Sequence, residues 1–324
     1  MAHRALTLKY RPQVFSDLVG QDHVTQVLSA ALASGRVAQA FLFTGARGVG
    51  KTTSARILAK ALNCQNLATA SAAPAKGKKA AAATEALREP CGTCTSCVEI
   101  ASGVSLDVLE IDGASNNSVE DVRRLQETIP FRPARDRFKI VIVDEVHMLS
   151  TGAFNAFLKT LEEPPPHVKF VFATTESHKV PVTIRSRCQR YDFRLIPQSV
   201  VSERVRHILA AEGLAADEHA IAIVAREAAG SMRDALTLLD QIVAFSGGKL
   251  VGDPTDGNLA KWPAIFAAGM FRKSNRWQRL WMVAGTLCGS VVHSTNFTCA
   301  GGSSIVLRRA LNAGVVSMCT SSMM

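Results

Sequence analysis

The order of apolar and polar positions along the chain predicts alternating strands and helices. Four short apolar runs have the character of buried strands: residues 40–44, 108–111, 139–143 and 169–174. Four longer segments carry apolar residues at helical spacing: residues 17–33, 52–62, 118–128 and 151–161. Because strands and helices alternate, the pattern predicts an α/β fold with a doubly wound parallel sheet.

From residue 198 the strand-like runs stop, and three amphipathic segments follow: residues 198–212, 216–229 and 231–245. This spacing predicts a small helical domain after the sheet. Helical periodicity fails beyond residue 248, where all three tryptophans of the chain lie. We therefore expect three regions: an α/β domain over 1–180, a helical domain over 181–247 and an atypical basic tail over 248–324.

One stretch within the α/β region is low in complexity. Residues 68–86 contain ten alanines together with three lysines, Pro74 and Gly77, so they offer little to bury. We expect an exposed loop over residues 68–89. It is either a plain insertion without chemistry or a basic tether for nucleic acid.

The charge of the chain is unevenly distributed. The chain has 37 lysines and arginines against 27 acidic residues, a net charge of +10. Residues 257–324 hold seven basic residues and no acidic one, which leaves 30 basic and 27 acidic residues in the first 256. The total charge therefore gives no argument about function.

The longest apolar stretches are far shorter than the about 20 residues that cross a bilayer, and the N-terminus lacks a hydrophobic signal core. We expect no membrane association and a cytoplasmic location.

Residues 45–52 read GARGVGKT, which fits the complete phosphate-loop pattern, and they lie between a predicted strand and a predicted helix. Glycines at such positions let backbone N–H groups surround the β- and γ-phosphates of a nucleotide, near the positive end of the helix. Lys51 is expected to contact those phosphates, and the Thr52 hydroxyl to bind Mg²⁺. The predicted nucleotide-binding residues are Gly45, Gly48, Val49, Gly50, Lys51, Thr52 and Thr53.

The strand predicted at 139–143 is followed by two acidic residues, Asp144 and Glu145. The carboxyl end of a parallel sheet is its ligand edge. Asp144 is expected to orient Mg²⁺ and its waters, and Glu145 to act as general base towards the attacking water. An Asp-Glu pair after an apolar strand is often only a surface turn, but together with a phosphate loop it favours a catalytic role.

Four of the eight cysteines have the spacing of a metal site. Cys64 precedes a Cys-x2-Cys-x2-Cys run at Cys91, Cys94 and Cys97. In a cytosolic chain such turns point thiolates at one centre, and four thiolates fill a tetrahedral structural Zn²⁺ site with no open position. An iron–sulfur cluster and unliganded thiols are the alternatives. Cys188 has no partner at ligand spacing, which favours core packing.

Several longer motifs resemble a known family. The run LSTGAFNAFLKTLEEPP at residues 149–165 directly follows DEVHM at 144–148. Further shared motifs are KYRP at 9–12, VGQ at 19–21, ATT at 173–175, SRC at 186–188 and GSMRDA at 230–235. Together with the phosphate loop and the four cysteines, they resemble the gamma/tau subunits of the bacterial DNA polymerase III clamp loader. The resemblance extends over about residues 5–247.

The resemblance implies an AAA+ P-loop NTPase fold with a zinc-module insertion at about residues 62–100, followed by a three-helix lid. By similarity, Arg11, Pro12 and Val19 line the adenine pocket. His147 and Met148, within the acidic motif, are expected to be structural.

Three further residues receive roles from the resemblance. Thr175 is implied to read the γ-phosphate at the end of its strand, and Arg233 to close the lid over ATP as a second sensor. Arg187 is implied to be an arginine finger that reaches the ATP of a neighbouring subunit.

The implied activity is that of an ATPase that uses ATP binding and hydrolysis to load the sliding clamp on primed DNA during replication. The implied partners are other clamp-loader subunits, the sliding clamp and primed DNA, the last contacted through its phosphates rather than its bases. A non-catalytic scaffold or partial loader subunit is the alternative, but an intact phosphate loop and acidic pair favour the motor. No polymerase active site is implied.

The resemblance fades after about residue 247. In the family a helical collar domain that assembles the loader follows the lid, whereas residues 248–324 lack helical periodicity and, after Asp256, acidic residues. This composition favours an out-of-frame or disordered tail over a new domain. We therefore expect this chain to fail in assembly.

Overall fold

The computed structural model describes residues 4–67, 88–246, 249–250, 297–298 and 304–305. Its centre is a five-stranded sheet in the order β2-β3-β4-β1-β5, in which every neighbouring pair is parallel. The strands are β1 (Ala40–Gly45), β2 (Val108–Asp112), β3 (Lys139–Asp144), β4 (Val168–Thr174) and β5 (Gln189–Phe193). The predicted parallel α/β sheet is confirmed, and four of its strands lie where the apolar runs indicate.

The fifth strand lies beyond the expected domain boundary at residue 180. β5 pairs with β1 from Phe41 opposite Gln189 to Gly45 opposite Phe193, so the sheet extends to Phe193. Its inward side chains, Tyr191 and Phe193, are each 5% exposed and belong to the same core as Phe43. Apolar residues at every second position thus form an edge strand without an apolar run.

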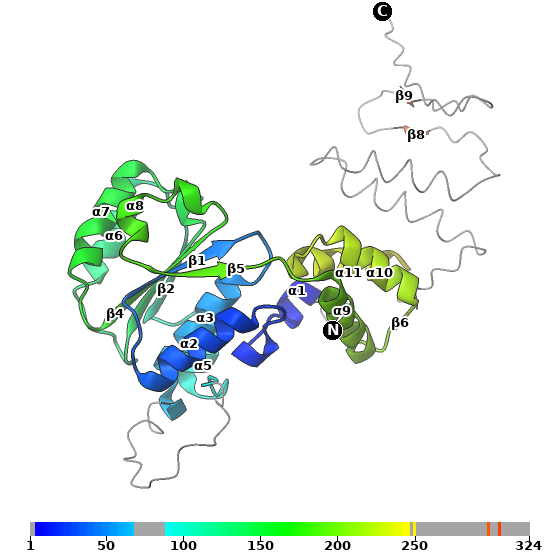
Figure 1. Ribbon diagram of the computed structural model, residues 1–324, viewed down its shortest axis with the longest axis horizontal. Helices are drawn as coiled ribbons and strands as arrows, with labels where there is room; N and C mark the ends of the chain where they lie inside the picture. Colours follow the sequence, from blue (N-terminus) through cyan, green and yellow to red (C-terminus); the bar gives the residue numbers. More distant parts are fainter. Residues whose placement is uncertain (1–3, 68–87, 247–248, 251–296, 299–303, 306–324) are drawn as a thin grey trace, which may run out of the picture. The chain divides into compact units, whose positions relative to one another are not determined.

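Helices cover both faces of the sheet (Figure 1). One face packs against α2 (Asp22–Ser34), α3 (Lys51–Asn63) and α5 (Thr95–Ser102). The other packs against α6 (Val119–Thr128), α7 (Thr151–Glu162) and the short α8 (Val182–Arg185). Along β1, Phe41 and Phe43 enter the first core and Leu42 the second, and all three are fully buried. A shift by one residue would exchange the two cores, so this alternation determines the strand's register.

The other described elements are short: α1 (Leu6–Lys9) and the 3₁₀ turns η1 (Phe15–Asp17), η2 (Val146–Met148) and η3 (Ser177–Lys179). The helix predicted from residue 17 begins instead at Asp22. Gly20, between η1 and α2, has φ +72°, a left-handed conformation that turns the chain towards the start of α2.

The predicted exposed loop at 68–89 lies outside the described residues except for its last two. Arg88 and Glu89 are anchored rather than exposed: the Arg88 N–H donates to Ser29 Oγ at 2.9 Å, and Glu89 accepts from Phe15 and Ser16. The expected exposed loop is therefore wrong at its end, because Arg88 bonds to the Ser29 hydroxyl and Glu89 to two backbone N–H groups of the α/β domain.

Three helices follow the sheet: α9 (Gln198–Ala211), α10 (Glu218–Glu227) and α11 (Met232–Ser246). They agree with the predicted amphipathic segments and bury one stripe each, exemplified by Val205, Val224 and Leu239. A two-stranded parallel pair, β6 (Ala215–Ala216) with β7 (Lys249–Leu250), was not predicted. The N-terminal helix α1 packs against α11, where the Leu6 N–H donates to Asp240 Oδ2 at 3.2 Å.

Residues 254–324 form a separate unit, of which the structure describes only β8 (Phe297–Thr298) and β9 (Ser304–Ile305), an antiparallel pair. The expected out-of-frame or disordered tail at 248–324 otherwise lies outside the described residues. Within the described part of the chain, no helix is both long and apolar enough to cross a membrane.

Candidate functional site

The phosphate loop joins the end of β1 to the start of α3, as predicted. Gly45, Gly48 and Gly50 have φ values of +144°, +76° and +105°. These conformations are strained for residues with a Cβ, so the loop needs glycine at each position. Gly50 then caps α3 at its N-terminus, where the unpaired backbone N–H groups and the helix dipole favour a phosphate.

Lys51 lies in the first turn of α3 and is 5% exposed. Its Nζ donates to the carbonyl oxygens of Gly45 and Ala46 at 2.8 and 2.7 Å. Burial lowers the pKa of Lys51, while the nearby carboxylates of Glu145 and Asp144 oppose that shift. The ammonium is therefore held inside the loop, where it can exchange its carbonyl partners for phosphate oxygens.

The next residue, Thr52, is paired with the acidic motif. Its hydroxyl donates to Asp144 Oδ2 at 2.6 Å, across a separation of 92 residues. Asp144 is the last residue of β3, opposite Asp112 at the same edge of the sheet. A hydroxyl and a carboxylate at this distance form the hard-oxygen donor pair that Mg²⁺ prefers, so these two residues fit the predicted magnesium site.

Glu145 follows Asp144 in a left-handed conformation, with φ +45°. Non-glycine residues adopt this region rarely, and here it turns the carboxylate away from the strand direction. Glu145 Oε2 accepts from the backbone N–H of Thr175 at 3.2 Å and from its hydroxyl at 3.1 Å. The predicted general base and the predicted γ-phosphate sensor are therefore in direct contact.

His147, which was expected to be structural, also borders the predicted general base, Glu145. Its Nδ1 lies 3.4 Å from Glu145 Oε2 and 3.1 Å from Thr174 Oγ1, and its side chain is 6% exposed. Its Nε2 lies 3.4 Å from Glu176 Oε1. Its position two residues after Glu145 was the only sequence signal for this contact.

The lid reaches the phosphate loop through the start of α11. The Arg233 N–H donates to the Gly48 carbonyl at 3.4 Å, and a Cβ at Gly48 would collide with the hydroxyl of Ser231. The structure thus brings the backbone of Arg233 to the loop, and the role of its guanidinium as a second sensor stays a prediction. Ser231, which is 5% exposed, was missed by the sequence analysis because serine there is an ordinary start for a helix.

Two of the residues expected around adenine, Arg11 and Pro12, lie beside α3. Arg11 Nε donates to Thr53 Oγ1 at 3.3 Å, and both border a small cavity together with Pro12. Burial is the main cause that lowers the pKa of Arg11. Val19 is half-buried in the turn before α2, next to Leu18, which packs beside Gly50.

Arg187 is not brought to the phosphate loop. It follows α8, and its guanidinium donates to the Thr183 carbonyl and to Glu162 Oε1, both at 2.7 Å. Its side chain is 33% exposed. The neighbouring Cys188 packs against the α6–α7 core, and burial raises the pKa of its thiol to about 12.

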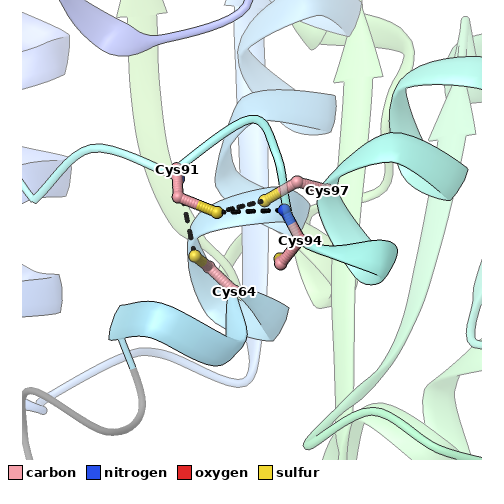
Figure 2. A group of neighbouring side chains, drawn as sticks. All are labelled: Cys64, Cys91, Cys94 and Cys97. Carbon is pink, nitrogen blue, oxygen red and sulfur yellow. Dashed lines mark hydrogen bonds between the residues drawn. The ribbon is translucent and has the colours of Figure 1, made fainter.

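The four predicted metal ligands do come together, and Figure 2 shows them gathered at one place. Cys64 ends α3, Cys94 begins α5, and Cys97 lies in its first turn. The four sulfur atoms lie within 4.8 Å of one another, with Cys91 Sγ and Cys97 Sγ 4.0 Å apart. Tetrahedral Zn²⁺ with bonds of about 2.3 Å separates its sulfur ligands by about 3.8 Å, so the cluster fits a structural zinc site.

Two family models match this chain. Residues 20–197 match the one described as DNA polymerase III, delta subunit, and residues 200–248 match the DNA polymerase III clamp loader subunit, ATPase lid domain. The second match ends close to the residue at which the sequence resemblance fades.

Curated relatives agree with the models. The chain is 47% identical over 247 residues to DNA polymerase III subunit tau of Bacillus subtilis, and 46% identical over 250 residues to that of Escherichia coli. It is 44% identical over 248 residues to subunit gamma of Buchnera aphidicola. These matches cover 76 to 77% of this chain but only 41%, 36% and 64% of the three relatives.

Solved structures of the Thermotoga maritima RuvB Holliday junction branch migration motor match with a TM-score of 0.50 and 17% identity. The match covers 75% of this chain and 69% of that chain, and at this identity it shows a shared fold alone. The two domain models and the tau and gamma relatives carry the assignment further: this chain belongs to the AAA+ family of DNA polymerase III clamp-loader subunits.

Proposed function

We propose that this chain is an ATPase subunit of the DNA polymerase III clamp loader, which binds and hydrolyses ATP while the sliding clamp is loaded on primed DNA. The strongest support is the 2.6 Å hydrogen bond from Thr52 Oγ1, in the first turn of α3, to Asp144 Oδ2, at the end of β3. Bound there, Mg²⁺ would neutralise charge on the phosphates. Family membership supplies the setting of DNA replication.

The phosphates of ATP are bound by the loop between Gly45 and Thr52, with Lys51 releasing its two carbonyl partners to contact them. Glu145 takes the proton of the attacking water, since a carboxylate one residue beyond the magnesium ligand is within reach of the γ-phosphate. Thr175 holds that carboxylate through two hydrogen bonds and thereby sets its direction. Arg233 adds positive charge from the lid side.

Adenine is placed beside Arg11 and Pro12, next to α3, with Val19 as the third contact. The 3.3 Å hydrogen bond from Arg11 Nε to Thr53 Oγ1, two residues after Lys51, supports this position.

The position of Arg187 favours a second candidate function. In it, the subunit binds ATP but hydrolyses it poorly by itself. This residue pairs with Glu162 within its own chain and lies apart from the phosphate loop in the contacts described above. An arginine finger contributes about 10³- to 10⁵-fold to phosphoryl transfer, so hydrolysis would depend on a neighbouring subunit.

The four cysteines hold one structural Zn²⁺, and the chain acts in the cytoplasm with other clamp-loader subunits, the sliding clamp and DNA phosphates as partners. The sulfur geometry supports the metal. Membership of the clamp-loader family supports the partners and a cytoplasmic location as part of this proposal. Because the chain spans about two fifths of the length of the tau relatives, the assembly that it forms is itself part of the proposal.

The test is equilibrium binding of ATP to the purified chain with and without Mg²⁺, followed by single-turnover hydrolysis. Binding that needs Mg²⁺ and falls in Asp144→Asn supports the proposal. Binding that is indifferent to Mg²⁺ and to Asp144→Asn contradicts it.

A further inference from the structure

Residues 11–17, here called the base-side segment, are held by two charged side chains from other parts of the fold. Glu89 accepts the backbone N–H of Phe15 at 2.7 Å through one oxygen and that of Ser16 at 2.8 Å through the other. From α3, Lys60 Nζ donates to the Gln13 carbonyl at 2.5 Å and to Gln13 Oε1 at 2.9 Å. The segment is thus fixed at its middle and at its end.

These hydrogen bonds are of the stronger kind. A carboxylate that accepts two backbone N–H groups at the start of η1 satisfies donors that would otherwise need water. Lys60 is 2% exposed, so its ammonium depends on the oxygens of Gln13. Gln13 in turn donates its side-chain amide to the Arg11 carbonyl at 2.9 Å, which extends the constraint to the residues proposed to face adenine.

Both anchors adjoin the four cysteines. Glu89 lies two residues before Cys91, separated only by the buried Pro90, and Lys60 lies one helical turn before Cys64 on α3. Ala101 of α5 borders the same small cavity as Arg11 and Pro12. Cys94 and Cys97 lie at the start of this helix. A metal bound by all four sulfur atoms would therefore join the two elements that hold the base-side segment.

We propose that Glu89 and Lys60 are positioning residues for nucleotide binding, and that through them the four-cysteine site raises the affinity of this chain for the base-bearing part of ATP. The proposal rests on the function proposed above. The four cysteines would hold the metal outside the hydrolytic site, and a metal there would fix the distance between Glu89 and α3, so that Arg11 and Pro12 are in position before the nucleotide binds. Preorganisation of this kind raises affinity because less conformational entropy is lost on binding.

The test compares ATP with inorganic tripolyphosphate, which has the phosphates but no base, as ligands of zinc-loaded protein in titration calorimetry. In Glu89→Ala we expect the dissociation constant for ATP to rise about tenfold, since two charge-assisted hydrogen bonds are lost, and that for tripolyphosphate to stay within about twofold. Glu89→Gln keeps one acceptor and should fall between the two.

A matched control is offered by Arg135, which ties the same helix α5 to another part of the fold. Its guanidinium donates to both oxygens of Glu99, at 2.8 and 2.7 Å, away from the base-side segment. Arg135→Ala should leave the affinity for both ligands within about twofold, because surface pairs contribute little and this one does not touch residues 11–17.

Removal of zinc from wild type and Glu89→Ala then tests the link to the cysteines, with zinc content measured directly. Wild type should lose about tenfold in ATP affinity and Glu89→Ala no more than about twofold further, since both changes act on the same contacts. If zinc-loaded Glu89→Ala binds ATP like wild type, or loses tripolyphosphate affinity equally, the inference is overturned while the proposed ATPase stands. A wild-type chain that binds no ATP would overturn both.

Discussion

Thr175 donates both its backbone N–H and its hydroxyl to one oxygen of Glu145, at 3.2 and 3.1 Å. The residue at the end of β4 and the acid after β3 therefore form one unit, although 30 residues separate them in the chain. In the proposed function, a γ-phosphate that drew away the Thr175 hydroxyl would leave this carboxylate with the backbone N–H of Thr175 as its donor from that residue.

Glu145→Gln should retain ATP binding and lower the single-turnover rate by about 10²- to 10⁴-fold, the usual contribution of a general base. The amide keeps the shape of the side chain and can still accept from Thr175, but it cannot take a proton. The control is Glu163→Gln, an exposed acid at the end of α7. Equal rates in Glu145→Gln and wild type would exclude Glu145 as the base.

Lys51→Ala should weaken ATP binding by about 30-fold or more, because a buried charge partner of the phosphates is lost. The exposed Lys159 on α7 supplies the control, since Lys159→Ala removes the same charge from a solvated site. Binding of a fluorescent ATP analogue measures both. Unchanged affinity in Lys51→Ala would show that this ammonium does not contact phosphate.

The purified chain should contain about one zinc ion, and Cys97→Ala should lose it together with more than about 3 kcal/mol of the free energy of unfolding. Cys97 is fully buried, so its loss removes both a ligand and packing. Cys188→Ala, at a cysteine outside the cluster, should keep the zinc. Iron with visible charge-transfer absorption, or a metal-free protein of wild-type stability, would refute the zinc assignment.

Stability should depend on pH through Lys169, which is 4% exposed and donates to the Val37 carbonyl at 3.1 Å. Burial, with a smaller contribution from Arg137, lowers its pKa to about 8 from the usual lysine value of 10.5. The unfolded chain therefore binds the proton between pH 8 and 10.5 and the folded chain does not, so this group adds stability as the pH rises through that window.

From pH 7 to pH 10, the unfolding free energy of wild type should accordingly rise by up to about 3 kcal/mol relative to that of Lys169→Met. Denaturant titrations at the two pH values measure it. A difference that stays constant would show that Lys169 titrates alike in the folded and unfolded chain.

Arg187→Ala should leave the ATP affinity and the slow hydrolysis of the isolated chain unchanged, because the guanidinium pairs with Glu162 and is proposed to act only on a neighbour's nucleotide. The free energy of unfolding should change by less than about 1 kcal/mol, as expected for an exposed ion pair. A fall in hydrolysis at high dilution would mean that Arg187 acts within its own chain.

The sequence predicts those parts of the fold that depend on local pattern. Strands such as β3 and β4 are buried on both faces and appear as apolar runs, whereas β5 has only Tyr191 and Phe193 to mark it. The phosphate loop and the cysteine cluster were predicted because spacing dictates their chemistry. The partners of Glu89 and His147 were not, since contacts across 74 residues or around a turn leave no periodic signal.

The approach of Cys91 to Cys64 has a practical consequence. The Cys91 N–H lies 3.5 Å from Cys64 Sγ, so the chain leaves and re-enters the fold at almost the same point. For a flexible connection between two such ends, the entropic cost of closure grows by only about 0.6 kcal/mol for each doubling of its length. A change in the length of the connection between residues 67 and 88 should therefore cost the fold little, provided that Arg88 and Glu89 keep their contacts.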